Sequence, residues 1–322
     1  MTRPAIGMCF DRSFPASAVP EFARALEAGG VEEMWFIEDC FFTTAPPLAA
    51  AALACTERLR VGLGILPAVA RTAAVTAMEI ATLASLGPGR VVAGIGHGVQ
   101  SWMGQMGVQP ASPVAAIEEV IVAVRSLLRG DEVTTAGSTV RLDRVRLEHV
   151  PDPVPPVVAG VRGPRSLAVA GRRADGVLLD GPCPPSYVEV ARREAAAPPD
   201  WQVRCFAPIC ITDERDRSFR YVAEFLGEML DDPHNRGLRT LAAHDHLVEA
   251  WRGGGEEALA AVPAEWWGPV GLIGTIDDGV AYVRAMEAVG VTSISAFPAP
   301  DLEVARGQLG DVVALVRRLD DG

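Results

Sequence analysis

The sequence predicts a single (β/α)8 barrel with an inserted helical segment before the last strand. Short apolar runs with strand character alternate with longer segments of helical periodicity along the whole chain. Eight such runs occur, and a helical segment follows each of them. The length of 322 residues also suits an α/β barrel, which often forms one domain of ~250 residues. A doubly wound open sheet is the alternative arrangement.

The individual elements follow from apolar runs, helical spacing and glycine stops. Strands are expected at residues 5–10, 33–38, 60–65, 91–95, 157–160, 176–180, 203–211 and 292–297. Helices are expected at residues 16–28, 44–55, 72–86, 113–128, 165–173, 184–196, 275–289 and 302–319. Glycines directly after several helical segments mark their ends, at Gly29-Gly30, Gly87, Gly130 and Gly290. A small hairpin is predicted at residues 132–135 and 140–142, with its turn at Ala136-Gly137.

The stretch 213–270 has helical character but no place in the strand–helix alternation. We interpret it as an insertion into one domain of residues 1–322, and as a candidate lid over the barrel mouth. The sequence shows no linker, low-complexity segment or internal repeat that would divide the chain.

Composition excludes several classes of function. The net charge of −12 opposes binding to nucleic acids and to anionic membranes. The sequence contains no lysine, which excludes Schiff-base aldolases, pyridoxal-phosphate enzymes and P-loop nucleotide binding. The six cysteines form no CxxC pair or zinc-type spacing, so no metal site is expected. Unpaired thiols and the absence of a signal-peptide pattern favour a cytoplasmic location.

Barrel enzymes carry their active sites at the carboxyl ends of the strands, and this rule selects four rim segments, at residues 38–40, 62–65, 94–98 and 160–165. After the fourth strand, the segment GIGHG places His97 between Gly96 and Gly98, where an imidazole could move a proton. The same segment could equally be a tight turn without a ligand role. His244 and His246 are spaced i,i+2 and diverge on a helix, so they are not expected to share a metal ion.

The segment AGVRGPRS after the fifth strand is the best phosphate candidate. It is a glycine-rich turn that opens a helix near Pro164, and the free amide groups at a helix start favour anions. Arg162 and Arg165 add positive charge and bidentate donors. Surface arginines on a capped helix are the alternative reading.

Two adjacent carboxylates, Glu38 and Asp39, end the second strand. Side chains alternate along a strand, so one of them should point into the barrel. A carboxylate in that position is costly to bury unless it is paired or functional. Both are candidate catalytic groups.

Three segments in this order resemble the bacterial luciferase-like superfamily, in particular its coenzyme F420-dependent branch, which includes methylenetetrahydromethanopterin reductase. They are VEEMWFIEDC, RVGLGILPAVARTAAVTAMEIATLASLGPGRVVAGIGHG and VVAGVRGPRSLAVAGRRADGVLLDG. The resemblance runs along most of the chain and is best over residues 5–180.

The resemblance implies a set of cofactor contacts. A non-prolyl cis peptide is expected at Gly64-Ile65, bulging against the middle ring of a deazaflavin. Gly96, His97 and Gly98 should lie beside the ring. The backbone of Gly160, Val161, Arg162 and Gly163 should hold the cofactor phosphate, and Asp39 should contact the deazaflavin head. Cys40 stands where the family usually has His, and Val99 where some members have Glu. These departures favour a reductase over an alcohol dehydrogenase.

The resulting hypothesis is a reductase that transfers hydride from reduced F420 to an activated C=N or C=C bond of a small molecule. His97, Glu38 and a water are the candidate proton donors. An FMN-dependent luciferase-like monooxygenase is the alternative within the superfamily. A non-catalytic barrel that binds a flavin-like ligand is the alternative from another class. The sequence leaves open whether the chain forms a homodimer.

Overall fold

The computed structural model describes residues 3–321, and its core is a closed barrel of eight parallel strands. The strands lie in the order β11-β1-β2-β3-β4-β7-β8-β9, and pairing of β9 with both β8 and β11 closes the ring. Their bounds are β1 (Ala5–Phe10), β2 (Glu33–Phe36), β3 (Arg60–Pro67), β4 (Val91–Gly96), β7 (Val157–Gly160), β8 (Gly176–Leu179), β9 (Gln202–Ile211) and β11 (Ser293–Phe297). The predicted (β/α)8 barrel is confirmed.

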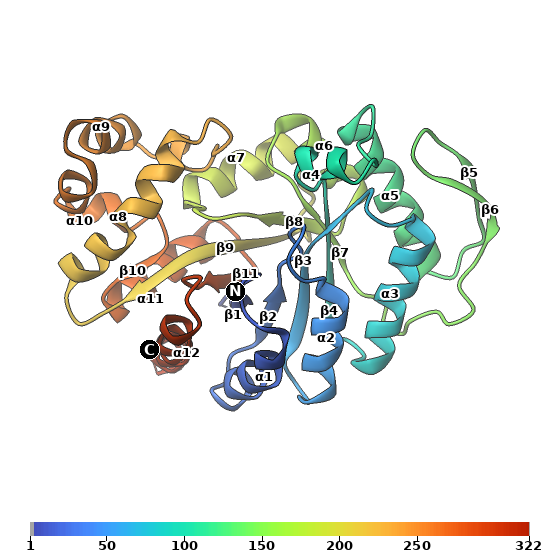
Figure 1. The fold of residues 1–322 in the computed structure, drawn as a ribbon, viewed down its shortest axis with the longest axis horizontal. Helices are drawn as coiled ribbons and strands as arrows, with labels where there is room; N and C mark the ends of the chain where they lie inside the picture. The colour runs from blue at the N-terminus through green and yellow to red at the C-terminus, as the bar shows by residue number, and fades with distance from the viewer. Residues whose placement is uncertain (1–2, 322) are drawn as a thin grey trace.

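Helices surround this barrel (Figure 1). They are α1 (Val19–Ala28) with the preceding 3-10 turn η1 (Ala16–Ala18), α2 (Ala45–Ala54), α3 (Ala73–Leu86), α4 (Gln100–Gln105), α5 (Pro113–Leu128), α6 (Pro164–Arg173), α7 (Pro185–Ala195), α11 (Ile276–Ala288) and α12 (Leu302–Asp320). The predicted hairpin is present as β5 (Val133–Ala136) and β6 (Arg141–Val145), which pair antiparallel. The short helix α4 has no counterpart among the predicted elements.

The insertion between β9 and α11 is more broken than the predicted long helical stretch. It contains α8 (Arg215–Asp231), the 3-10 turn η2 (Leu238–Thr240), α9 (His244–Ala260) and α10 (Ala264–Trp267). It ends in an unpredicted short strand, β10 (Leu272–Gly274), which pairs with the end of β9. Its helices bury an apolar cluster of their own, in which Phe219 stacks on Trp267. The pairing of β10 with β9 joins the insertion to the barrel sheet.

At the amino-terminal ends of the strands, the barrel interior is built around a buried charge, that of Glu33. Glu33 is 1% exposed and pairs with Arg204 at 2.6 Å. It also accepts hydrogen bonds from Trp35 Nε1 (2.9 Å) and Ser293 Oγ (2.6 Å). Burial opposes the ionisation of Glu33, but attraction to Arg204 and Arg60 and these hydrogen bonds outweigh it, so its pKa is lowered. Side chains from β2, β3, β9 and β11 therefore meet on one carboxylate.

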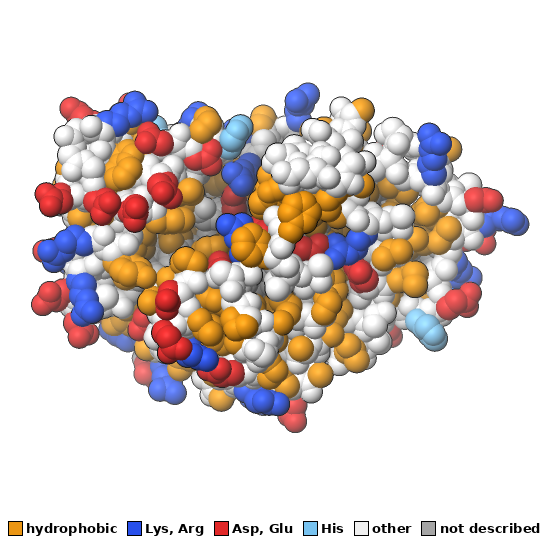
Figure 2. Space-filling view, in the orientation of Figure 1, with side chains coloured by type: hydrophobic (Ala, Val, Ile, Leu, Met, Phe, Trp, Pro, Cys, Tyr) orange, Lys and Arg blue, Asp and Glu red, His pale blue; other side chains and the backbone are white. Residues whose placement is uncertain are grey.

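The surface seen in Figure 2 carries acidic and arginine side chains interspersed, and no large basic patch gathers on this face. This distribution agrees with the acidic net charge. Within residues 3–321, no helix combines the length and the apolar character that crossing a lipid bilayer requires.

Glu33→Gln is expected to destabilise the fold by about 3–5 kcal/mol, because it leaves the Arg204 charge buried without its counter-ion. The measurement is urea unfolding at pH 7, with the exposed Glu256→Gln as a control that should change stability by less than ~0.5 kcal/mol. Since the pKa of Glu33 is lower in the folded than in the unfolded protein, its stabilising effect is complete above about pH 4.5 and is lost as the pH falls through the folded-state pKa. A stability difference that does not shrink in acid would contradict this role.

Candidate active site

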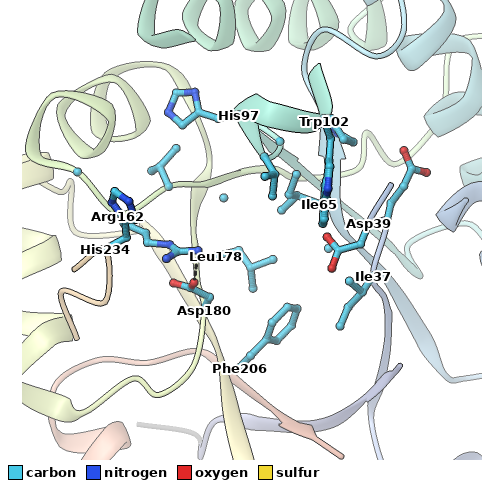
Figure 3. A pocket seen from close by; sticks show the side chains of 18 of the residues that line it. Ile37, Asp39, Ile65, His97, Trp102, Arg162, Leu178, Asp180, Phe206 and His234 are labelled. Atoms are coloured by element: carbon cyan, nitrogen blue, oxygen red, sulfur yellow. Dashed lines mark ion pairs between the residues drawn. The ribbon is translucent and has the colours of Figure 1, made fainter. Parts of the chain in front are cut away.

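A cavity of about 770 Å³ opens at the carboxyl ends of the barrel strands. This volume is in the range of cofactor and ligand pockets. Figure 3 shows Arg162, Asp180 and His234 on one side of it, and Ile65, Trp102 and Asp39 on the other. Of the predicted site residues, ten line the cavity: Glu38, Asp39, Gly64, Ile65, His97, Gly98, Gly160, Val161, Arg162 and Gly163. Cys40, Gly96 and Arg165 do not.

The wall formed by β3 bulges toward the cavity at Ile65. The pairing of β3 with β4 shifts register between Leu63 and Leu66, and the Gly64-Ile65 peptide is cis. Glycines on the next two strands of the barrel, β4 and β7, make room for the bulge. A Cβ at Gly160 would lie 2.4 Å from Ile65 Cγ2, and a Cβ at Gly96 would lie 2.7 Å from Ile65 Cγ1. The structure thus brings the three predicted glycine segments together around one side chain.

The turn from β7 into α6 carries free amide groups. Gly163 is the N-cap of α6 and has no side chain to accept hydrogen bonds from the first turn. The first amides of a helix have no partner within the helix, and they favour an anion through their partial positive charge. Gly160 to Gly163 line the cavity. The turn is therefore a candidate site for a phosphate group.

The two arginines of this turn differ in their surroundings. The Arg162 guanidinium pairs with Asp180 at 2.7 Å, so its charge is already compensated. Arg165 is exposed and does not line the cavity. Desolvation raises the pKa of Asp180, although Arg162 opposes this effect. Binding of an anion here would depend mainly on the backbone amides.

His97 links the β4 loop to the start of α6. Its Nε2 lies 2.9 Å from Ser166 Oγ, and either group could donate. Burial lowers the pKa of His97, while the backbone of Pro113 acts in the opposite direction. The imidazole is therefore largely neutral at neutral pH. It lines the cavity and is not paired with a carboxylate.

Both carboxylates at the end of β2 are paired with arginines that the sequence analysis did not single out. Glu38 is buried and accepts from Arg71 at 2.5 and 2.8 Å and from the Ala45 amide at 2.9 Å. Asp39 pairs with Arg12. Glu38 thus fixes the start of α2 and has few lone pairs left for a substrate. Burial raises the pKa of the Cys40 thiol, with a further contribution from Glu38 and Asp39.

The floor of the cavity is apolar. Phe206 lines it, and the fully buried Trp35 packs edge to face against Phe206 with ring centroids 5.6 Å apart and donates to Glu33. Ile37, Leu178 and Phe297 complete the apolar lining around Phe206. A flat apolar ring system would bury its surface against this floor without leaving polar groups unpaired.

A family model described as luciferase-like monooxygenase matches residues 5–293. The chain belongs to this family. The barrel and the Ile65 bulge described above are thus features of a luciferase-like protein.

Named relatives of this luciferase-like chain include two oxidoreductases. A 5,10-methylenetetrahydromethanopterin reductase of Methanolobus tindarius is 30% identical over 59% of this chain and 58% of its own length. An F420-dependent glucose-6-phosphate dehydrogenase of Nakamurella multipartita is 29% identical over 59% of this chain and 60% of its own length. Both alignments therefore span about three fifths of the relative. The solved structure of a coenzyme F420-dependent tetrahydromethanopterin reductase from Methanopyrus kandleri covers 98% of this chain and 97% of its own chain, with a TM-score of 0.77 and 19% identity, which shows the shared fold.

Several residues that line the cavity of this luciferase-like protein were not predicted. Asp180 directly follows β8, so the rule that sites lie at carboxyl strand ends could have found it. Trp102 comes from the unpredicted α4. His234 and Arg236 come from the insertion, between α8 and η2, and no local motif marks them.

Gly160→Ala is expected to destabilise the protein by about 1–3 kcal/mol, because its Cβ would overlap Ile65 and force the β3 bulge to move. The midpoint of urea unfolding measures the effect. Gly307→Ala in α12 is the control, since no atom lies within 4 Å of its Cβ and the exchange should stabilise the helix by up to ~1 kcal/mol. Equal stability of the Gly160→Ala variant and the unchanged protein would show that the bulge has room to spare.

Proposed function

We propose that this luciferase-like protein is an F420-dependent oxidoreductase that acts as a reductase on an activated C=N or C=C bond of a small molecule. The observation that carries the proposal is the convergence of the Ile65 bulge, the Gly160–Gly163 turn and an apolar floor around one cavity. The two F420-dependent oxidoreductases among its relatives and structural neighbours support the choice of cofactor.

The residues present fit such a cofactor. The free amides of the β7–α6 turn would hold its phosphate, and Ile65 would support one face of its ring. Reduced deazaflavin, when bound, supplies a hydride. The protein then has to orient the substrate, exclude water and provide a proton.

His97 is the group we propose for the proton. It lines the cavity, and its Nε2 shares a hydrogen bond with Ser166. Glu38, the other candidate, is occupied by Arg71 and by the start of α2, and we assign it a positioning role. Asp39 remains a proposed contact of the cofactor head, with its carboxylate held by Arg12.

The cofactor is tested by titrating the purified protein separately with F420 and with FMN and following fluorescence. F420 is expected to bind with at least tenfold higher affinity, a difference of ~1.4 kcal/mol. Reoxidation of reduced F420 in the presence of unsaturated substrates, without oxygen consumption, would support a reductase. Tight FMN binding with substrate-dependent oxygen consumption would instead favour the monooxygenase of the sequence analysis.

His97→Gln is expected to lower kcat by ~10²–10⁴-fold, because it removes the proton-transfer group while keeping a donor to Ser166. Since burial lowers the pKa of His97 from its usual value of 6.5, the protonated imidazole becomes the major form only below that pH. The kcat of the unchanged enzyme should therefore rise as the pH falls through this range, and the His97→Gln variant should lose this dependence. An identical pH profile in both proteins would remove His97 from the chemistry.

A further inference from the structure

The turn that presents its amides to the cavity is held by Arg236 of the helical insertion and by Tyr187 of α7. The carbonyl oxygen of Arg162 accepts hydrogen bonds from Arg236 Nη1 at 2.6 Å and from Tyr187 Oη at 3.0 Å. Arg236 also forms a bidentate ion pair with Glu194 of α7, with both distances 2.9 Å. Two parallel hydrogen bonds to one carboxylate fix the plane of a guanidinium group. The donor to the Arg162 carbonyl is therefore held in place by α7.

This contact determines where the next amide points. The carbonyl of Arg162 and the N–H of Gly163 belong to one planar trans peptide, so they point in opposite directions. Donors that hold the carbonyl therefore also set the direction of the Gly163 N–H. On the other side of Gly163, its carbonyl accepts from the Leu167 amide at 2.8 Å, while a side chain that could restrain the residue is missing.

The segment that carries Arg236 is itself closely packed. A Cβ at Gly237 would lie 2.5 Å from the carbonyl oxygen of Pro182, so the segment touches the backbone of the β8–α7 loop. Asn235 Oδ1 accepts from the Leu238 amide at 3.2 Å and leads the chain into η2. Asp232, His234 and Arg236 all line the cavity. The insertion thus reaches the cavity through a short, well-supported segment.

We propose that Arg236 is a positioning residue of the cofactor site: by holding the Arg162 carbonyl, it sets the Gly163 amide for the phosphate. This inference rests on the proposed function, since it takes the turn as a phosphate site. An amide that is already oriented loses little conformational entropy when the ligand binds. Residues 232–237 of the insertion are then part of the site.

Global stability should depend little on this contact. The side chains of Arg236 and Glu194 are 32% and 23% exposed, and a partly exposed ion pair contributes less to folding than a fully buried one. The insertion also keeps its own apolar cluster when the pair is removed. Loss of Arg236 should therefore act locally, on the order of the turn and on phosphate affinity.

The first test compares Arg236→Gln with the unchanged protein by hydrogen exchange without ligand. The amides of residues 163, 165 and 166 are expected to exchange several-fold faster in the variant. Arg215→Gln is the matched control, because Arg215 forms an equivalent bidentate pair with Asp278 at 2.8 and 2.8 Å on the same insertion without lining the cavity. Equal exchange in Arg236→Gln and the unchanged protein, or equal acceleration by Arg215→Gln, would overturn the proposal.

The second test measures the dissociation constants of F420 and of the corresponding deazaflavin that lacks the phosphate and everything beyond it. Arg236→Gln should weaken F420 binding by about tenfold and leave the phosphate-free compound within about twofold. Arg236→Lys should recover part of the loss, since one ammonium donor can still reach the Arg162 carbonyl. An equal loss for both compounds would overturn the positioning role. If the unchanged protein bound no F420, the proposed function would fail, whereas the exchange experiment would still decide whether Arg236 orders the turn.

Discussion

The buried carboxylate of Glu33 is the interaction on which the interior of the barrel depends. Its partners come from strands on several sides of the ring: Arg60, Arg204, Trp35 and Ser293. A charge in this position is tolerated only when every partner is in place, because an isolated buried carboxylate is very costly. The hydrogen bond from Trp35 to Glu33 fixes the position of the indole ring. The indole in turn packs against Phe206, which lines the floor of the cavity.

Above that floor, the shape of the site depends on glycines, which leave space where other residues would place side chains. The β3 bulge brings Ile65 into space that a side chain on β4 or β7 would otherwise fill. Gly96 and Gly160 are therefore needed for the packing of Ile65, in addition to any contact with a ligand. Glycine at Gly62 has a related cause, since a Cβ there would lie 2.2 Å from the Trp35 ring. Glycines therefore make room both for Trp35 beneath the floor and for Ile65 in the wall of the cavity.

The strand–helix alternation was enough to predict the barrel, because periodicity and glycine stops are local signals. The rim rule and the resemblance together located Ile65, His97 and the turn at Gly160, which all line the cavity. Neither the rim rule nor the resemblance could show which carboxylates at the cavity are paired with arginines. The partners of Glu38 and Asp39 are Arg71 and Arg12, which lie on other loops, and nothing near either carboxylate in the sequence indicates them. Arg236 is still more remote, since it reaches the turn only after the insertion has folded on α7.

These pairings have a common consequence for the chemistry of the cavity. Three of the four carboxylates at the cavity, those of Glu38, Asp39 and Asp180, each have an arginine of their own, whereas Asp232 accepts a hydrogen bond from the His234 amide. The cavity then offers a substrate an apolar floor, a neutral imidazole and carboxylates that are mostly paired with arginines. Such surroundings suit a reaction in which a bound cofactor supplies the reactive electrons and the protein supplies shape and one proton. Glu38, Asp39 and Asp180 are poorly suited to act as a free nucleophile or base, because releasing any one of them would leave its arginine unpaired.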